Sequence, residues 1–503
     1  MKLSPTAQDL LSRVPPSLAT RLEGVIDRLP GVGPKVREEK RKVAAELKRK
    51  VAEHRPSELL MPRLPDAGLS AQTVLSTLKT VADRENPRWK EGQLSGGVYH
   101  GDPAHLALLN EVYALYSQAN PLHADVWPSV ARFEAEIVAM TAQLLGGDPR
   151  SSDDGQVVCG TLSSGGTESI MLAMKSYRDA AGARRRRHGI VAPASAHPAF
   201  DKAAHTLGLE MVRVPVGKDL RADVKAMKRA IKSNTIVMVG SAPSFPHGLI
   251  DPIEELSELA RRKGLGFHTD ACLGGFVLPF ARELGYPVPR FDFSLPGVTS
   301  MSADTHKFGY AAKGSSVVLY RGRALRRSQY FITPDWSGGL YATPGFAGSR
   351  PGALVASAWT AMVTTGKQGY LDATRKVLEA AARVRKAIAD QPDLEVVGEP
   401  LWVVAFRSRT IDVYRVLDEM TARGWNLNGL QKPAAVHLCV TLRHTRPGVT
   451  DRFAKDLAES VAAAKGAPPT GGMAPVYGLA ASLPFKGLVG DILAAYLDAV
   501  HDP

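Results

Sequence analysis

Between residues 157 and 320, short apolar segments alternate with amphipathic segments of about a dozen residues, and this alternation strongly constrains the fold. The apolar segments include "VVCGTL", "TIVMVGSAP" and "SSVVLYR", and the amphipathic ones include "ADVKAMKRAIKS" and "DPIEELSELARRKG". Strands that alternate with helices of this length predict βαβ units in a mostly parallel sheet. Ligands of such sheets bind beyond the carboxyl ends of the strands. We therefore expect an α/β fold with its functional residues in the loops that follow the strands.

The flanking regions have a different character. Residues 34–54 are charged and favour helix, which predicts an exposed arm, and apolar spacing predicts a helix that begins near Pro128. After about residue 360 the predicted helices and strands come in mixed order, as in a smaller α+β domain. A chain of 503 residues is too long for one core. We expect an N-terminal helical arm and segment over residues 1–115, a large domain over 116–360 and a C-terminal α+β domain over 361–503.

The charge balance favours anionic partners. Lys and Arg outnumber Asp and Glu by 63 to 50, a formal net charge of +13. Nucleic acid, an anionic membrane surface and phosphorylated substrates are the partner classes that such a charge attracts. The densest basic run, "ARRRRHG" at 183–189, is most simply a solvated loop, and no RNA- or DNA-binding motif accompanies it. We therefore do not expect a nucleic-acid partner.

Cysteine usage and the N-terminal sequence bear on the compartment. The chain has 3 cysteines, Cys159, Cys272 and Cys439, without CxxC spacing, which excludes a disulfide framework or a zinc ribbon and fits a reducing compartment. The N-terminal "MKLSPTAQDLLSRVPPSLATRL" lacks the apolar core of a signal peptide, and no stretch reaches the ~18 apolar residues of a membrane span. We expect a cytoplasmic protein with no transmembrane segment and no metal site.

The stretch "SSGGTES" at 163–169 lies between a predicted strand and a predicted helix. Glycines such as Gly165 and Gly166 let the backbone approach an anion closely, and the helix that follows presents unpaired N–H groups. Thr167 adds a hydroxyl. The stretch lacks both the P-loop lysine and the GxGxxG spacing, which disfavours an ordinary nucleotide loop. It predicts a site for a phosphate or another anion.

The stretch "FHTDACLGG" at 267–275 places His268, Asp270 and Cys272 on one face of a strand end. A carboxylate on an apolar strand is unfavourable unless it has a partner. Two interpretations stay open for Asp270. It either caps a neighbouring turn or holds a proton on a cationic ring nitrogen.

A third stretch, "SADTHKFGYAAKGSS" at 302–316, contains Lys307 and Lys313. On its own it would be interpreted as a surface loop. Together with the anion site and Asp270, Lys307 completes the requirements of pyridoxal phosphate, which are a phosphate grip, an acid at the pyridine nitrogen and a lysine that binds the aldehyde as a Schiff base. Lys313 can stay protonated to bind a second phosphate, and its proximity is expected to lower the pKa of Lys307.

Longer passages carry a family resemblance. The most specific are "GVTSMSADTHKFGYAAKGSSVVLY" (297–320) and "DWSGGLYATPGFAGSRPG" (335–352), and others include "LSGGVYHGD" (94–102), "NPLHADVWPSVARFEAEIV" (120–138) and "HTDACLGGF" (268–276). On these passages the chain resembles the sphingosine-1-phosphate lyases from about residue 85 to 480. That family belongs to the fold-type I pyridoxal-phosphate enzymes and is related to the group II amino-acid decarboxylases. Its membrane-anchored members begin with a transmembrane helix, and this chain instead looks like the soluble bacterial type.

The resemblance implies a role for individual residues. Lys307 would form the Schiff base, Asp270 would pair with the pyridine nitrogen, and His197 would stack on the ring. The cofactor phosphate would be held by Gly165, Gly166, Thr167, Ser302 and His306, and by Gly348 and Ser349 of the other subunit of a homodimer. The substrate phosphate would be held by Tyr99, Asn120, His123, Lys313, Ser349 and Arg350. Tyr477 would lie near the reacting carbon.

The implied reaction is a retro-aldol cleavage of phosphorylated sphingoid bases, such as sphingosine 1-phosphate and dihydrosphingosine 1-phosphate, between C2 and C3. The products would be a long-chain aldehyde and phosphoethanolamine. The base that removes the hydroxyl proton stays open among a water, Lys307, Tyr477 and His123. The alternative function is a pyridoxal-phosphate-dependent amino-acid decarboxylase, which would not need the phosphate-binding set around Tyr99, His123 and Lys313. A non-catalytic anion-binding protein would carry no Schiff base on Lys307.

Overall fold

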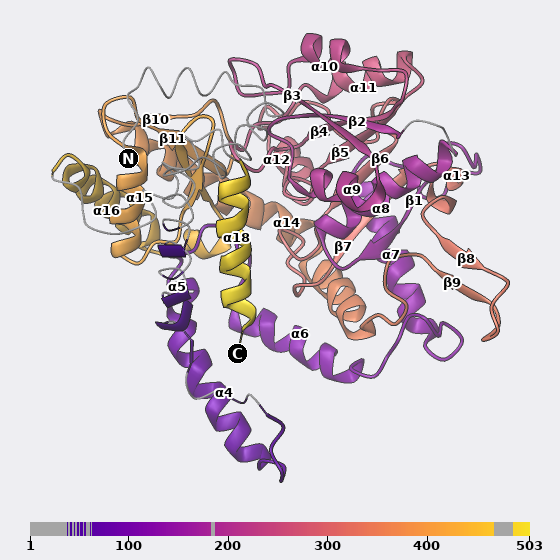
Figure 1. Ribbon diagram of the computed structural model, residues 1–503, viewed down its shortest axis with the longest axis horizontal. Coiled ribbons are helices and arrows are strands. Elements are labelled where there is room, and N and C mark those ends of the chain that lie inside the picture. The colour runs from indigo at the N-terminus through magenta and orange to yellow at the C-terminus, as the bar shows by residue number, and fades with distance from the viewer. Residues whose placement is uncertain are drawn as a thin grey trace.

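The computed structural model describes residues 63–182, 187–466 and 486–502, with scattered residues between 38 and 61. Most of the expected charged arm over 34–54, the basic run at 183–186 and Tyr477 lie outside the described residues. The described chain forms a large α/β body and a smaller group of strands and helices beside it (Figure 1).

A seven-stranded sheet forms the centre of the large body, in the order β1-β7-β6-β5-β4-β2-β3. Only β7 runs antiparallel to its neighbours β1 and β6, and the other pairs are parallel. The expected mostly parallel sheet is therefore confirmed. The strands are β1 (Val158–Ser163), β2 (Gly189–Pro193), β3 (Glu210–Val214), β4 (Thr235–Ser241), β5 (Gly266–Asp270), β6 (Ser300–Ala303) and β7 (Ser316–Arg321).

Helices cover both faces of this sheet. Side chains of β4 alternate between two apolar clusters, because Met238 packs into one while Val237 and Val239 pack into the other. Burial on both faces explains why these strands are continuous apolar runs in the sequence. The helices of the large body are α7 (Pro128–Leu144), α8 (Gly166–Ala180), α9 (Ala199–Leu207), α10 (Val224–Ala230), α11 (Ile253–Arg262), α12 (Leu278–Glu283) and α13 (Arg323–Arg327). The predicted helix start at Pro128 is confirmed, with this proline in the first helical turn.

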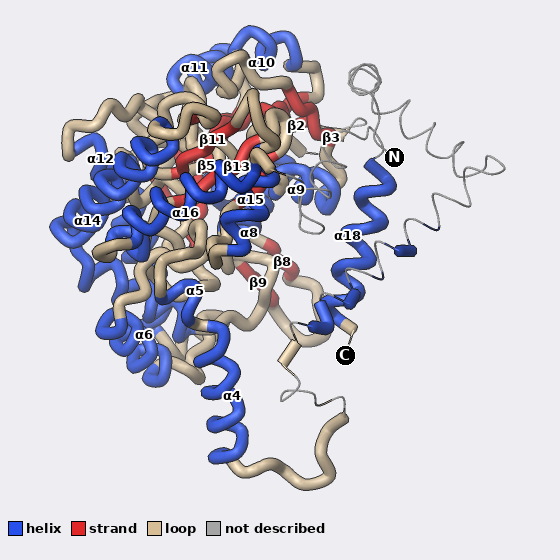
Figure 2. The backbone as a smooth tube through the Cα atoms, turned by 90° about the vertical axis from the view of Figure 1, so that its left-hand side faces the viewer, coloured by secondary structure: helices blue, strands red, loops and turns tan. Residues whose placement is uncertain are grey.

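The second group is built on a four-stranded antiparallel sheet in the order β10-β11-β13-β12. The N-terminal segment joins it through a parallel bridge between Leu94 and Asn426. The elements are β10 (Glu395–Val396), β11 (Val403–Arg407), β12 (Asn428–Leu430), β13 (Ala435–Cys439), α15 (Val413–Ala422), η2 (Leu442–Thr445) and α16 (Val449–Ala464). Helix α18 (Lys486–His501) stands apart from them (Figure 2). Two features project from the body, namely α4 (Ala71–Glu85) and the hairpin of β8 (Phe331–Thr333) and β9 (Tyr341–Thr343) (Figures 1 and 2).

Helix α14 (Gly352–Ala389) connects the two groups. It packs against α7 and α6 (Pro103–Leu115) on one side and against α16 and the β10–β11 strands on the other. Its regular geometry is interrupted at Gly366, whose φ is 58° and ψ is 174°. The expected boundary at residue 360 falls inside this helix, and the division at 115 and 360 stays a proposal. Among the residues that the structure describes, none of the helices combines the length and apolar character needed to cross a bilayer.

Gly160 of β1 leaves no room for a side chain beside β7. A Cβ atom at Gly160 would lie 2.0 Å from the carbonyl oxygen of Val318 and 3.0 Å from Leu319 Cδ2. Gly160→Ala should therefore destabilise the protein by about 1–3 kcal/mol, because the two strands must separate to admit the methyl group. A lower midpoint of chemical denaturation would show this. Gly68→Ala is the matched control, since no atom lies within 4 Å of its Cβ position, and equal midpoints for both variants would contradict the close contact.

Candidate active site

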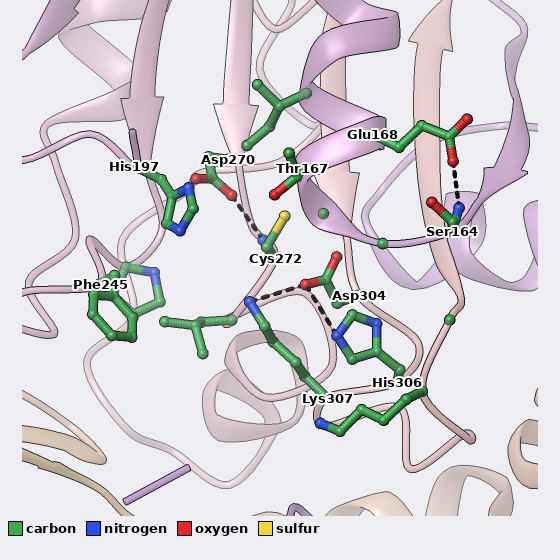
Figure 3. Close-up of a pocket in the computed structure, with 17 residues that line it drawn as sticks. Ser164, Thr167, Glu168, His197, Phe245, Asp270, Cys272, Asp304, His306 and Lys307 are labelled. Carbon is green, nitrogen blue, oxygen red and sulfur yellow. Dashed lines mark hydrogen bonds and ion pairs between the residues drawn. The ribbon is translucent and has the colours of Figure 1, made fainter. Parts of the chain in front are cut away.

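The carboxyl ends of the parallel strands surround a cavity of about 410 Å³. The loops after β1, β4, β5 and β6 line it, and His197 contributes from the segment after β2. Figure 3 shows His197, Asp270, Asp304 and Lys307 converging on this space, the last two from the same loop after β6. The structure thus brings together the three sequence stretches that were expected to form a site.

The anion site lies at the start of α8. Gly166 is the first residue of that helix, and a Cβ atom there would lie 2.8 Å from both carboxylate oxygens of Asp304 and 2.8 Å from Cys272 Sγ. Only glycine fits at this point. Thr167 lines the same cavity, and the first N–H groups of a helix have no partner within the helix. Backbone donors at a helix N-terminus suit a phosphate group, so this loop fits the phosphate of a cofactor.

Asp270 ends β5, and its carboxylate faces the cavity. The backbone N–H of Cys272 donates to Asp270 Oδ1 at 3.1 Å, and Ser302 Oγ lies 3.4 Å from the same oxygen. His197 lines the cavity too, and its Nδ1 accepts a hydrogen bond from the backbone N–H of Ala199 at 3.1 Å. Burial lowers the pKa of His197, Asp270 opposes this, and Lys307 reinforces it, so the imidazole is neutral at neutral pH. A carboxylate and a neutral aromatic ring beside a lysine fit a pyridinium ring.

Lys307 forms an ion pair that the sequence analysis did not anticipate. Its Nζ lies 2.9 Å from Asp304 Oδ2, and the Asp304 side chain is 1% exposed. Burial alone would lower the pKa of Lys307, but the Asp304 carboxylate outweighs burial and holds that pKa above its ordinary value. Burial likewise opposes ionisation of Asp304, yet Lys307 and His306 hold the pKa of its carboxyl below the ordinary value. The pair is therefore ionised at neutral pH.

The expected lowering of the Lys307 pKa is wrong in its net direction, although a neighbouring cation such as Lys313 still opposes the charge. The pKa of Lys307 is raised, whereas burial and the charge of Lys307 lower the pKa of Lys313 to about 8. The reason is that the nearby carboxylate of Asp304 acts mainly on Lys307. A signal for Asp304 existed in the sequence, since a residue three positions before a lysine lies beside it in a helical turn.

Ser302 and His306 occupy different surroundings. His306 lines the cavity, and its Nδ1 donates to the carbonyl oxygen of Ser315 at 2.6 Å. Ser302 is fully buried and its hydroxyl contacts His268, Cys272 and Asp270. This position fits a role beside Asp270 better than the expected contact with the cofactor phosphate.

The expected substrate-phosphate residues fall into two groups in a single chain. In the first, Lys313 lines the cavity and its Nζ lies 4.7 Å from the centre of the Tyr99 ring. In the second, Asn120 Nδ2 donates to Ser349 Oγ at 3.2 Å, and Asn120 Oδ1 accepts the backbone N–H of Arg350 at 3.1 Å.

The second group lies away from the cavity of its own chain. The guanidinium of Arg350 pairs with Glu134 at 2.9 Å. The other residues expected near the phosphates but not found on the cavity wall of the same chain are Asn120, His123, Gly348 and Ser349. Tyr99 and Ser302, which are buried, do not line the cavity either. Tyr477 is outside the described residues. One chain therefore builds the cofactor part of the site and Lys313, and carries the remaining groups elsewhere on its surface.

Comparison with known proteins agrees with this geometry. Residues 58–409 match the family model described as the pyridoxal-dependent decarboxylase conserved domain. The chain is 48% identical over 485 residues to a sphingosine-1-phosphate lyase of Oryza sativa subsp. japonica, which covers 94% of this chain and 88% of that protein. It is 42% identical over 496 residues to sphingosine-1-phosphate lyase 1 of Rattus norvegicus, which covers 97% of this chain and 86% of that protein.

Solved structures give the same picture. The structure of Burkholderia pseudomallei K96243 sphingosine-1-phosphate lyase superposes with a TM-score of 0.79 at 46% identity, over 81% of this chain and 94% of that one. A glutamate decarboxylase of Lactobacillus brevis CGMCC 1306 superposes with a TM-score of 0.70 at 20% identity, over 83% of this chain and 98% of that one. The second likeness shows the fold alone, and the expected fold-type I architecture is confirmed.

Removing the charge of Asp304 should lower the pKa of Lys307, so that Lys307 loses its proton at a lower pH than in the wild type. In Asp304→Asn, burial and Lys313 act on Lys307 without opposition from the carboxylate, so the pKa of Lys307 should fall by roughly 1–3 units. The rate at which the apoprotein captures pyridoxal phosphate, trapped on Lys307 with borohydride, should reach its plateau at correspondingly lower pH. Asp154→Asn, at an exposed carboxylate paired with Arg323, is the control. Superimposable pH profiles for wild type and Asp304→Asn would contradict the assignment.

Proposed function

The chain belongs to the sphingosine-1-phosphate lyase family, on the pyridoxal-dependent decarboxylase fold, and from this premise we propose that it cleaves phosphorylated sphingoid bases to a long-chain aldehyde and phosphoethanolamine. The observation that carries the proposal is the presence of two lysines in one cavity, one paired with a buried carboxylate and the other lying over Tyr99. Two lysines suit a substrate with both an amine and a phosphate, because one lysine can bind the cofactor aldehyde that the amine attacks and the other can bind the phosphate.

Four groups of this chain fit the cofactor. Bound pyridoxal 5'-phosphate supplies an aldehyde that links to amines and a ring that accepts the electrons of a breaking bond. In our proposal Lys307 binds that aldehyde, Asp270 holds the proton on the ring nitrogen, and His197 lies against the ring. The backbone at Gly165 and Gly166, with Thr167 and His306, binds the phosphate. The crowding around Gly166 supports this, since a Cβ atom there would displace Asp304 and Cys272, which line the same cavity.

Lys313 and Tyr99 distinguish the proposal from the decarboxylase alternative. The pKa of Lys313 is lowered to about 8 by burial and by Lys307, so most Lys313 side chains still carry a proton at neutral pH. A phosphate beside Lys313 would stabilise that charge further. Loss of carbon dioxide from an amino acid needs no such second cation. We assign Lys313 and Tyr99 to the phosphate of the substrate.

We also propose a homodimer with shared active sites. Residues that the family resemblance assigns to the phosphates, Asn120, Ser349 and Arg350, lie together but away from the cavity of their own chain. The β8–β9 hairpin carries large apolar side chains in the open, with Trp336 57% and Leu340 85% exposed. Clustered exposed apolar residues are typical of contact surfaces. A second copy that covers the hairpin would also bring Ser349 and Arg350 to the other chain's cavity.

The proposed setting is the cytoplasm, with the substrate met at an anionic membrane surface. Cys159, Cys272 and Cys439 are buried free thiols, as expected in a reducing compartment. The formal net charge of +13 favours approach to anionic lipids.

Substitution of the two lysines should separate chemistry from phosphate binding. Lys307→Ala should reduce aldehyde release from dihydrosphingosine 1-phosphate to background, because no amine remains to bind the cofactor aldehyde. Lys313→Ala should keep the cofactor but lower kcat/KM about ten- to a hundredfold, the worth of a hydrogen bond to a charged group. Lys263→Ala, on the exposed end of α11, should behave as wild type.

The same assay tests the alternative. Carbon dioxide released from amino acids, with no aldehyde from the phosphorylated sphingoid base, would overturn the lyase proposal. Full aldehyde release by Lys307→Ala would overturn the assignment of the lysine.

Mixing two inactive variants tests the shared site. Lys307→Ala and Arg350→Ala should each be nearly inactive, because each damages a different part of every site. In mixed dimers one site would carry both substitutions and the other neither, so activity should return when differently tagged chains are co-expressed and purified through both tags. A purified mixed dimer that stays as inactive as its parents, or a chain that sediments as a monomer, would contradict the proposal.

A further inference from the structure

A chain of buried polar side chains leads from α8 to Asp270. His268 lies on β5 two residues before Asp270, and both are paired in register with serines of β6, His268 with Ser300 and Asp270 with Ser302. His268 Nδ1 lies 2.8 Å from Ser300 Oγ, and its Nε2 lies 3.2 Å from Ser302 Oγ. Ser302 Oγ lies 3.4 Å from Asp270 Oδ1. These hydrogen bonds therefore join four side chains across two strands.

The far end of this chain is Tyr177 of α8. Its hydroxyl lies 2.7 Å from Ser300 Oγ and 2.7 Å from Thr299 Oγ1. The ring crosses β5 at Gly266, where a Cβ atom would lie 2.2 Å from Tyr177 Cε1. Gly266 thus leaves the space through which Tyr177 reaches Ser300. The same helix presents Gly166 at its other end, so α8 contacts both the anion site and the polar chain.

The hydrogen bonds have one consistent direction when Asp270 is ionised. Complete burial lowers the pKa of His268 to about 4, with Asp270 opposing, so its ring has one donor and one acceptor nitrogen at neutral pH. A carboxylate only accepts, which orients the Ser302 proton toward Asp270. His268 Nε2–H then donates to Ser302, and Ser300 donates to Nδ1. The Tyr177 hydroxyl contacts Ser300 Oγ and also donates to the carbonyl oxygen of Phe267 at 3.3 Å. The reverse direction would turn the Ser302 proton away from the carboxylate.

We propose that His268 is a positioning residue for the cofactor, which through Ser302 holds the Asp270 side chain oriented toward the ring nitrogen of pyridoxal phosphate. The inference rests on the proposed function, because it assigns the cofactor ring to Asp270. It accounts for a polar chain that crosses two strands in a fully buried place, where unpaired polar atoms are unfavourable. It also assigns Ser302 to the ring nitrogen side of the site and not to the phosphate.

The test is the affinity of the apoprotein for pyridoxal phosphate and for an analogue with carbon in place of the ring nitrogen. Asp270 can act through a protonated nitrogen only on the first compound. His268→Phe keeps a ring in place and removes both nitrogens, and it should weaken binding of pyridoxal phosphate about tenfold or more while leaving binding of the carbon analogue unchanged. His268→Gln, which retains a donor and an acceptor, should recover part of the loss.

Two further variants distinguish the loss of these hydrogen bonds from a general disruption of the strand. Ser302→Ala should weaken binding of pyridoxal phosphate as His268→Phe does. The double variant should bind pyridoxal phosphate no more weakly than the single variant with the lower affinity, because both substitutions interrupt the same row of hydrogen bonds. Thr269→Val is the matched control. Thr269 lies between the two residues of interest, and its buried hydroxyl has no hydrogen-bond partner. It should bind both compounds like wild type.

The outcomes are distinct. Selective loss of pyridoxal phosphate binding in His268→Phe and Ser302→Ala supports the inference. Wild-type binding in both variants, or an equal loss of both compounds, overturns it while the proposed function stands. Failure of the wild-type protein to bind pyridoxal phosphate at all overturns the proposed function and this inference together. If His268→Phe does not fold, as shown by the melting of the apoprotein, Ser302→Ala alone decides.

Discussion

An ammonium on the cavity wall pairs with a carboxylate that is shielded from water, and this pairing of Lys307 with Asp304 is the interaction on which the site depends. A lone charge in such a place would be neutralised or would oppose folding. Asp304 is in turn held by Ser316 Oγ, which donates to its Oδ1 at 2.6 Å. Ser316 contacts Ser169 of α8, and Gly166 of the same helix leaves the carboxylate its space. Residues of β7 and α8 therefore surround this one ion pair and support the Asp304 carboxylate.

The cavity separates what the fold shares with the decarboxylases from what distinguishes this family. In our proposal, Gly166, Asp270, His197 and Lys307 bind the cofactor, which a decarboxylase would need as well. Lys313 over Tyr99 adds a second cation at the same cavity, with its pKa lowered only to about 8 by burial and Lys307. In our proposal, specificity for a phosphorylated substrate therefore comes from Lys313, in the loop six residues beyond Lys307, and not from the sheet.

Much of this could be predicted from the sequence because the strand ends carry their chemistry locally. The loop with Gly166, the acid at the end of β5 and Lys307 each lie in a short motif, and parallel strands bring such motifs to one edge. Asp304 was missed because its effect appears only when its carboxylate is seen to be buried against Nζ. For the same reason the pKa shift of Lys307 was predicted with the wrong sign. The position of Ser302 depends on strand register, and the separation of Asn120 and Arg350 from the cavity depends on the path of the chain, neither of which a motif reveals.

Helix α8 also fixes the distance between two of its contacts. Gly166 at its first turn and Tyr177 near its last are separated by 11 residues, about 16 Å at the rise of an α-helix. A single inserted or deleted residue between them would rotate one end by about 100° relative to the other, since a turn takes 3.6 residues. The number of residues between Gly166 and Tyr177 therefore fixes both the distance and the relative orientation of the two contacts. Substitutions between these two residues can preserve both contacts of the helix, whereas an insertion or a deletion would disrupt one of them.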